Sequence, residues 1–435
     1  MIYRLIISTS FLLLCSCLTN KQEEPVRMLW HQKIDLGEHF IGSGGFLDFY
    51  QGTIIGLDLS SSMQPFFRFM PEEPSQPLFY FGNRGQGPDD LLRPLSIQFV
   101  GNQAVGTLDI MTNTYVEFRI PNDNEVLKID TKLRFQSPLT QIIKTAFNQY
   151  IGLLGLSNEM FLLADSFGIP VKSFFEYPYQ DNDERQFATR SHAYQGALAA
   201  NPSKNKFVYS SFKGEIIHFY EIENNNIKTI AKIENVYPIY RKINEENLIG
   251  VEFHADGTDG YIDVYATEKF VYAIFSGKMI FDRKTNIRTD FEGTRLRIFD
   301  WSGIPVKEYE LDVPCNYLCV SDDDSKLWAI ATHPDISLVF FDLESETEIT
   351  TENRQDDETQ IKRNSLENQL INGNIYFSID STIDSKNLKD SIMSQIINLI
   401  NKNSLSINPD DIIDIQIEIL DGNIIRAPLI LKTAE

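Results

Sequence analysis

The sequence ADSFGIPVKSFFEYP, residues 164–178, occurs a second time as FDWSGIPVKEYELDVP, residues 299–314. Asp165 of the first copy corresponds to Asp300 of the second, a glycine follows three residues later in both, and Ile-Pro-Val-Lys is identical. An aspartate in this position can bind the backbone amides of a turn, while the glycine supplies a positive φ. Each copy therefore predicts a β-hairpin: a strand, an Asp-x-x-Gly turn and a second strand.

The segments that follow the two hairpins are also alike. NPSKNKFVYSSFKGEIIHFYEIE at 201–223 corresponds to SDDDSKLWAIATHPDISLVFFDLE at 321–344. The hairpin itself recurs after 135 residues, which is three units of about 45, the length of one four-stranded propeller blade. A two-sheet sandwich gives no reason for such a recurrence, and a β-solenoid prefers shorter and stricter periods. The repeat therefore favours a β-propeller.

Short β-branched and aromatic runs fill residues 36–345 and are broken repeatedly by Gly, Asn, Asp or Ser; TIIGLDL (53–59) and SLVFFDL (337–343) are examples. This pattern is typical of an all-β domain. Divided into units of blade length, the region holds six or seven blades. We therefore predict an all-β fold, a six-bladed or alternatively seven-bladed β-propeller of four-stranded antiparallel blades.

The composition limits the classes of partner. The chain has 435 residues, 42% of them hydrophobic, and a net charge of −22. A phosphate backbone requires a basic surface, and no cluster of Lys and Arg is present, so nucleic acid is excluded as the expected partner. The negative charge also repels anionic lipid, so contact with a membrane would need a separate anchor.

The first residues, MIYRLIISTSFLLLCSC, provide such an anchor. One basic residue precedes an apolar run that is too short to span a bilayer, which predicts an export signal over residues 1–16. Leu-Cys-Ser-Cys at its end resembles the lipobox of bacterial lipoproteins, which implies that Cys17 carries the lipid. Residues 17–35 would then form a lipidated, polar tether at the cell envelope, as in an outer-membrane lipoprotein that is periplasmic or surface-exposed. An ordinary signal peptide cut nearby is the alternative.

A family resemblance covers roughly residues 35–345. Four stretches in order are similar to the TolB-like six-bladed propeller lipoproteins common in Bacteroidetes: FGNRGQGPDDLLRPLSI (81–97), GALAANPSKNKFVYS (196–210), YIDVYATEKFVYAIFSGKMI (261–280) and LRIFDWSGIPVKEYELD (296–312). The resemblance implies the propeller fold and an envelope location. Most members of that family have no established activity, so it implies little about function.

The glycine-rich stretch YFGNRGQGPDDLLRP, residues 80–94, raises the question of a phosphate-binding loop. Its glycines match neither the Gly-x-x-x-x-Gly-Lys nor the Gly-x-Gly-x-x-Gly spacing, and the two aspartates would repel an anion. We therefore predict a crossing between blades in which Pro88 fixes the backbone and Asp89 or Asp90 caps it. Arg84 is retained as a candidate ligand-binding residue.

Local catalytic and metal motifs are absent from the sequence. The six histidines have no metal-binding spacing, and no nucleophile elbow is present. In HADGTDGYID, residues 254–263, Asp256, Asp259 and Asp263 lack the full calcium-loop pattern, and a polar turn between blades is the preferred interpretation. We therefore assign no catalytic residue, no metal and no cofactor.

The predicted function is a non-catalytic binding or scaffold module for a glycan, a peptide or an envelope protein. The alternative is a hydrolase or lyase acting on carbohydrate, with a site assembled from several blades at the central funnel. The two differ in what the funnel should contain. Convergent His, Tyr, Arg and carboxylates would indicate an enzyme, whereas aromatic and mixed polar side chains would indicate a binder.

Cys315 and Cys319 could in principle form a disulfide. They are four residues apart, about 13 Å in a strand, and a disulfide allows roughly 7 Å between Cα atoms. Free buried thiols are therefore favoured unless residues 316–318 form a turn.

Beyond the propeller we predict a polar linker at 346–368 and a small α+β region at 369–435. The latter has an amphipathic helix, SKNLKDSIMSQIINLINKN, between strand-like segments.

Overall fold

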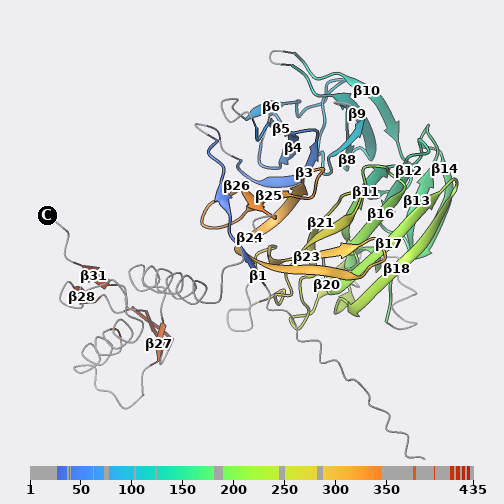
Figure 1. Ribbon diagram of the computed structural model, residues 1–435. Helices are drawn as coiled ribbons and strands as arrows, with labels where there is room; N and C mark the ends of the chain where they lie inside the picture. Colours follow the sequence, from blue (N-terminus) through green and yellow to red (C-terminus); the bar gives the residue numbers. More distant parts are fainter. Residues whose placement is uncertain are drawn as a thin grey trace, which may run out of the picture. The chain divides into compact units, whose positions relative to one another are not determined.

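The computed structural model describes residues 27–343 except 37–38, 40, 62, 73–77, 102–103, 123–124, 181–189, 244–249 and 282–287, and in the C-terminal region residues 376–378, 396, 412–415, 418–421, 424–426 and 429–431. The chain divides into two compact units, Met1–Ser345 and Glu346–Glu435. The first unit is a β-propeller whose blades are arranged around a common centre (Figure 1).

Four blades are separate four-stranded antiparallel sheets, each built from four consecutive strands. Their innermost strands are β3, β7, β11 and β15. In chain order the strands are β3 (Gly44–Tyr50), β4 (Thr53–Asp58), β5 (Phe66–Phe69) and β6 (Phe79–Phe81); β7 (Gln98–Gly101), β8 (Ala104–Asp109), β9 (Thr114–Arg119) and β10 (Ile129–Arg134); β11 (Leu139–Lys144), β12 (Tyr150–Leu154), β13 (Glu159–Ala164) and β14 (Pro170–Glu176); β15 (Gly196–Ala200), β16 (Lys206–Ser211), β17 (Glu215–Glu223) and β18 (Asn226–Val236).

The fifth and sixth blades share one long strand. Residues 305–310 at the start of β24 pair with β23, and residues 315–320 at its end pair with β25. One strand is therefore the outer strand of the fifth blade and the inner strand of the sixth. The two blades comprise β21 (Tyr261–Ala266), β22 (Phe270–Phe275), β23 (Gly293–Asp300), β24 (Pro305–Val320), β25 (Lys326–Ala331) and β26 (Ser337–Asp342). The predicted propeller of four-stranded antiparallel blades is confirmed, with six blades.

The N-terminal strands close the ring. β2 (Gln32–Lys33) pairs antiparallel with β26 and so supplies the fourth strand of the last blade, while β1 (Arg27–Leu29) pairs parallel with β24. His31 fixes the segment between them, because its backbone N–H and its Nδ1 lie 3.0 and 2.8 Å from the carboxylate oxygens of Asp312. Residues 27–33, which the sequence placed in the polar tether, are thus part of the propeller. The predicted signal, Cys17 and residues 18–26 lie outside the described residues.

The repeated hairpin has the predicted structure. Asp165 Oδ1 accepts hydrogen bonds of 2.9 Å from the N–H groups of residues 167 and 169, and Asp300 Oδ1 accepts bonds of 2.9 and 3.0 Å from those of residues 302 and 304. Gly168 and Gly303 have φ values of 77° and 80°. In each copy one carboxylate and one left-handed glycine therefore hold the turn between the third and fourth strands of a blade.

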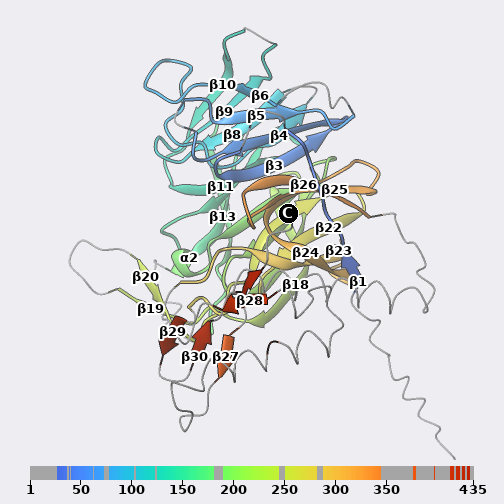
Figure 2. The same cartoon turned by 90° about the vertical axis from the view of Figure 1, so that its left-hand side faces the viewer.

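The predicted spacing of three blade units between the two hairpins is wrong. The copies lie in the third and fifth blades, two blades apart and not three. The additional length comes from three long connections: residues 177–195 between the third and fourth blades, and residues 237–260 and 276–292, which enter and interrupt the fifth blade. One of these holds the hairpin of β19 (Tyr240–Lys242) and β20 (Val251–Phe253), which lies beside the short helix α2 (Arg190–Ala193) (Figure 2).

Cys315 and Cys319 are both free and fully buried in the second half of β24, as their spacing predicts. Cys315 belongs to the apolar cluster of the last two blades, and Cys319 packs in the cluster between the sixth blade and the first. The two thiols therefore act as small apolar side chains in different layers of the core.

The second unit has five described strands in two small sheets, β27-β30-β29 and β28-β31. These are β27 (Tyr376–Ser378), β28 (Ile412–Ile415), β29 (Glu418–Asp421), β30 (Ile424–Arg426) and β31 (Leu429–Leu431). Apart from Ile396, the predicted amphipathic helix over 385–403 lies outside the described residues. Among the helices in the described part of the chain, none has the length and apolarity needed to span a membrane.

Candidate functional site

The innermost strands of the blades line a central channel, and a cavity of about 460 Å³ lies where these strands turn into the second strands. Residues of β3, β7, β11, β15 and β21 line it, together with the turn that follows β24. Its charged and amide side chains are Asp48, Gln98, Gln141, Lys144, Asn148, Asn201, Lys204, Asp263 and Asp322. Its aromatic side chains are Phe46, Phe49, Tyr50, Phe99 and Tyr265. We refer to this cavity as the channel mouth.

Asp48 on β3 is the most highly connected of these groups. Its carboxylate accepts hydrogen bonds from the backbone N–H of Phe99 at 2.6 Å, from its neighbour Phe49 at 2.8 Å and from the Tyr265 hydroxyl at 2.9 Å. Burial raises the pKa of Asp48 to about 6, against the opposing effect of these donors and of the positive charge on Lys204. The carboxylate is therefore ionised at neutral pH and fixed in place.

Similar links join other neighbouring inner strands. Each uses a polar side chain of one inner strand to bind the backbone of the next. The Gln98 side chain donates to the carbonyl of Ile142 (2.8 Å) and accepts from the amide of Lys144 (3.2 Å). In the same way, the Gln141 side chain accepts from the amide of Leu198 (2.8 Å), and the Asp263 carboxyl accepts from the amide of Leu318 (3.1 Å). The donors and acceptors satisfied in this way would otherwise be buried without partners. These bonds tie neighbouring inner strands to one another around the channel.

Asp263 and Lys204 have the other strongly shifted ionisations of the channel mouth. Burial raises the pKa of Asp263 to about 8, so its carboxyl is protonated at pH 7. Burial also lowers the pKa of Lys204 to about 8, where the charge of Asp48 acts in the opposite direction. At neutral pH the site thus presents a neutral acid, a carboxylate and an ammonium group.

The two lysines of the site differ in their pairing. Lys144 Nζ lies 2.8 and 3.0 Å from the two carboxylate oxygens of Glu117, so its charge is neutralised. Lys204 Nζ has no hydrogen-bond or ion-pair partner among the described residues, although Asp48 is close enough to affect its pKa. An ammonium and a carboxylate therefore line one cavity without contacting each other.

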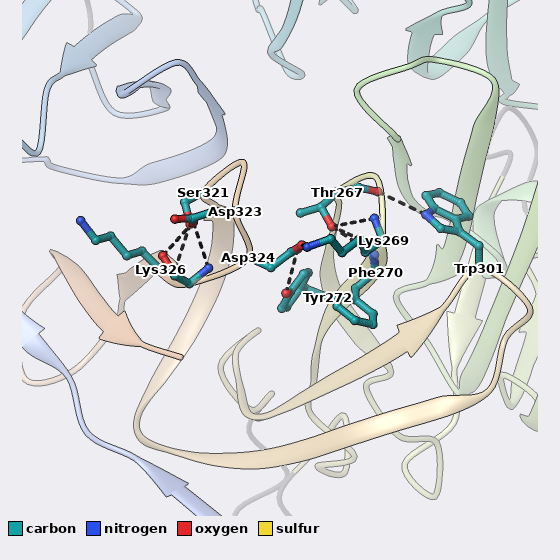
Figure 3. Close-up of polar contacts among 10 residues, drawn as sticks. Thr267, Lys269, Phe270, Tyr272, Trp301, Ser321, Asp323, Asp324 and Lys326 are labelled. Atoms are coloured by element: carbon teal, nitrogen blue, oxygen red, sulfur yellow. Dashed lines mark hydrogen bonds and ion pairs between the residues drawn. The ribbon is translucent and has the colours of Figure 1, made fainter. Parts of the chain in front are cut away.

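The turns at the rim are held by their own side chains. In the sixth blade, Asp323 Oδ1 accepts a bond of 2.5 Å from the Ser321 hydroxyl (Figure 3). It accepts a second bond, of 2.7 Å, from the Ser325 hydroxyl. The adjacent Asp324 accepts a bond of 3.1 Å from Tyr272 of the fifth blade. The hydrogen bonds from Ser321 and Ser325 lower the pKa of Asp323 to about 2. The turn that follows β24, which contributes Asp322 to the channel mouth, is therefore tied to the fifth blade.

Arg84 is not among the residues that line the channel mouth. Its Nη1 donates to the carbonyl of Leu92 at 3.3 Å, within the crossing from β6 to β7. In the same crossing Asp90 accepts from the amide of Gly87 at 2.8 Å, and Asp89 from that of Ile129 at 3.3 Å. Both aspartates cap backbone amides as predicted, so the glycine-rich stretch connects the first two blades.

The aspartates of residues 254–263 do not converge. Asp256 is exposed, Asp259 binds the buried ammonium of Lys213, and Asp263 lies in β21 at the channel. Elsewhere among the described residues, Asp290, Glu292 and His333 hold potential ligand atoms within 4.8 Å of one another.

The carboxylate of Glu292 in this group already binds the ammonium of a lysine. Lys278 Nζ lies 2.7 Å from Glu292, and the Thr332 hydroxyl also donates to this carboxylate. Because both ligand positions on the buried carboxylate are engaged by protein donors, we assign no metal to it.

Comparison with known proteins identifies the fold family. The model of the family described as TolB-like 6-blade propeller-like matches residues 37–323. A candidate exported protein from Bacteroides fragilis is 12% identical, with 72% of this chain and 94% of that one covered and a TM-score of 0.47. The calcium-binding protein regucalcin from Agrobacterium tumefaciens is 8% identical, with 73% and 95% covered and a TM-score of 0.44. No curated protein sequence matches the chain.

Proposed function

Since the chain belongs to the TolB-like six-bladed propeller family, whose fold places inner-strand side chains around one channel, we propose that it is a binding module whose channel mouth holds a carbohydrate. The proposal is supported mainly by one observation: Asp48 and Lys204 line the same cavity with opposite charges and do not pair with each other. The remaining arguments concern the chemistry of the ligand.

A hydroxyl group suits this pair of charges. It can donate its proton to the Asp48 carboxylate and accept a hydrogen bond from the Lys204 ammonium, and bonds to charged partners are the stronger ones. An anionic ligand would be repelled by Asp48 and Asp322, and a cationic ligand by Lys204. A neutral ligand with several hydroxyls satisfies both charges.

The aromatic lining supports the same ligand class. Tyr50 and Phe99 lie beside each other with ring centroids 5.4 Å apart, and both are partly exposed in the cavity. Ring faces of this kind accept the C–H face of a sugar, while Asn148 and Asn201 add amide donors and acceptors. Neither histidine nor arginine occurs among the described residues of the lining. The mixture is the one expected for a binder.

The variant Lys204→Met is expected to weaken carbohydrate binding by roughly 10- to 100-fold, because one hydrogen bond to a charged group is lost. The matched control is Lys206→Met two residues later, whose ammonium lies over the Trp301 ring at 5.8 Å and does not line the cavity. Binding is measured by titration calorimetry, with a glycan array used first to identify the sugar. Equal affinity for wild type and Lys204→Met would contradict the proposal, as would an array without any hit.

An enzyme acting on carbohydrate is the second candidate, and one specific observation favours it. Asp48 and Asp263 line the same cavity with pKa values of about 6 and about 8, and glycoside hydrolysis uses two carboxyl groups whose pKa values are held apart. Release of reducing ends from the sugar identified by the array, lost in Asp263→Asn, would establish this activity. If the sugar binds but is not hydrolysed, the binding module remains the proposed function.

We propose further that lipid on Cys17 holds the propeller at the cell envelope, on the strength of the Leu-Cys-Ser-Cys sequence that ends the signal. The variant Cys17→Ala is expected to move the protein from the membrane fraction to the soluble fraction and to abolish incorporation of labelled fatty acid. Cys315→Ala, at a buried thiol, serves as the control. Unchanged labelling of Cys17→Ala would rule out this anchor.

A further inference from the structure

We propose that the channel mouth is the first of two adjoining subsites and that its ligand is a short saccharide chain which leaves the channel between the sixth blade and the first. This inference rests on the proposed function and specifies its substrate class. It is based on a second cavity of about 240 Å³.

The second cavity continues from the channel mouth. Phe49 and Asp322 line both spaces, so a group bound in one lies next to a group bound in the other. Beyond these shared residues, the first blade contributes Gly52, Pro71 and Glu72 to the second cavity, and the sixth contributes Lys326 and Trp328. A ligand that follows the two cavities therefore runs outward from the channel across the junction of the two blades.

The second cavity is also lined by aromatic and charged residues, but its two opposite charges are paired with each other. Phe49, which is partly exposed, stacks on the buried Trp328 with ring centroids 5.0 Å apart and planes at 10°, so the Phe49 ring is held in place in the wall of the second cavity. Glu72 and Lys326 supply an exposed carboxylate and ammonium, 2.7 Å apart. Both cavities thus contain an aromatic ring, a carboxylate and an ammonium, and in the second cavity a ligand hydroxyl would bind at the exposed Glu72–Lys326 pair.

Asp322 marks the boundary between the subsites. It follows the sixth blade's inner strand, and one of its carboxylate oxygens accepts a bond of 3.3 Å from the amide of Gln51, in the turn of the first blade. This bond fixes the carboxylate where the two cavities meet and leaves its other oxygen to accept a ligand hydroxyl. A ligand that bridges the cavities would pass this group.

The test compares saccharides of increasing length. The probes are the cello-, malto-, xylo-, manno- and chito-series from monosaccharide to tetrasaccharide, titrated against the protein by calorimetry. In the series that binds, the disaccharide or trisaccharide is expected to bind at least tenfold more tightly than the monosaccharide. Lys326→Met and Glu72→Gln should each remove most of this gain and leave the affinity of the monosaccharide unchanged.

The variants are chosen so that folding does not decide the result. Lys326 and Glu72 form an exposed ion pair, which contributes little to stability. Lys269→Met is the control, because this lysine lies in the corresponding turn of the fifth blade, 3.6 Å from Asp324, and lines neither cavity. If the monosaccharide and the trisaccharide bind with equal affinity, the proposal of a second subsite is wrong, while the proposed binding of a sugar in the channel mouth is kept. If no series binds, both proposals fall.

Discussion

A chain that begins at residue 37 is expected to be less stable than one that begins at Arg27 by at least about 4 kcal/mol, and to aggregate when concentrated. It lacks β1 and β2, so Leu29, which is 9% exposed, no longer packs against the last blades, and the hydrogen bonds to Asp312 are lost. Burial of a large apolar side chain contributes about 1.5–3 kcal/mol, and each hydrogen bond to a charged group about 1.5–3 kcal/mol, so Leu29 and the two bonds to Asp312 together account for at least about 4 kcal/mol. Urea denaturation followed by intrinsic fluorescence measures the difference.

The expected aggregation has a separate cause. Without β2, the edge of β26 is exposed at residues 339–340, beside the fully buried Phe341. An unpaired edge of this kind pairs readily with another chain. Leu29→Ala is the graded comparison, expected to lose only a fraction of the stability and to remain monomeric because β2 still covers the edge. Equal unfolding midpoints for chains beginning at 27 and 37 would contradict the role of β1 and β2 in closing the ring.

The closing strands also show where sequence patterns stop being informative. The repeated hairpin predicted its own turn because an aspartate and a glycine at fixed spacing determine it locally. β1 and β2 have only three and two residues, most of them exposed, and such short segments have no hydrophobic periodicity. Their partners are close to 300 residues away, so only the closed ring defines them.

The predicted number of blades between the two hairpins is wrong for a related reason. The estimate of three units assumed blades of equal length. In the structure, the connections 237–260 and 276–292 lengthen the region around the fifth blade. Surface connections tolerate insertions because closing a longer loop costs little extra entropy. Each blade therefore keeps its four strands while the number of residues it occupies differs from blade to blade.

The site residues could be found only in part. Glycine-rich and Asp-rich loops attracted the functional predictions, yet the channel mouth is built from the first strands of the blades, and Asp48 and Tyr265 in one hydrogen bond are 217 positions apart. A signal was present: LDFY, IQFV, TQII and IDVY each place one Asp or Gln, at 48, 98, 141 and 263, among apolar or β-branched residues. A lone polar residue in a strand covered on both faces needs a buried partner or a channel.

Among the groups that line the channel mouth, Asp263 is expected to have the largest effect on how the free energy of unfolding depends on pH. Its pKa rises from 3.8 in the unfolded chain to about 8 in the folded one, so between these values the folded protein holds a proton that the unfolded chain has lost. Stability therefore falls as pH rises through this window and levels off above it. From pH 5 to pH 8 the contribution of this group falls by on the order of 4 kcal/mol.

Asp263→Asn isolates this contribution. The asparagine Oδ1 can still accept from the amide of Leu318, and the side chain no longer titrates. The unfolding free energy of the variant minus that of wild type, measured in urea at each pH, cancels the other titrating groups and is expected to rise by about 4 kcal/mol from pH 5 to pH 8. Asp48→Asn provides a graded control, because a pKa of about 6 predicts a rise of only about 1.4 kcal/mol over the same range. A flat difference for Asp263→Asn would mean that this carboxyl is already ionised in the folded channel, and the protonated acid required by the catalytic alternative would then be missing.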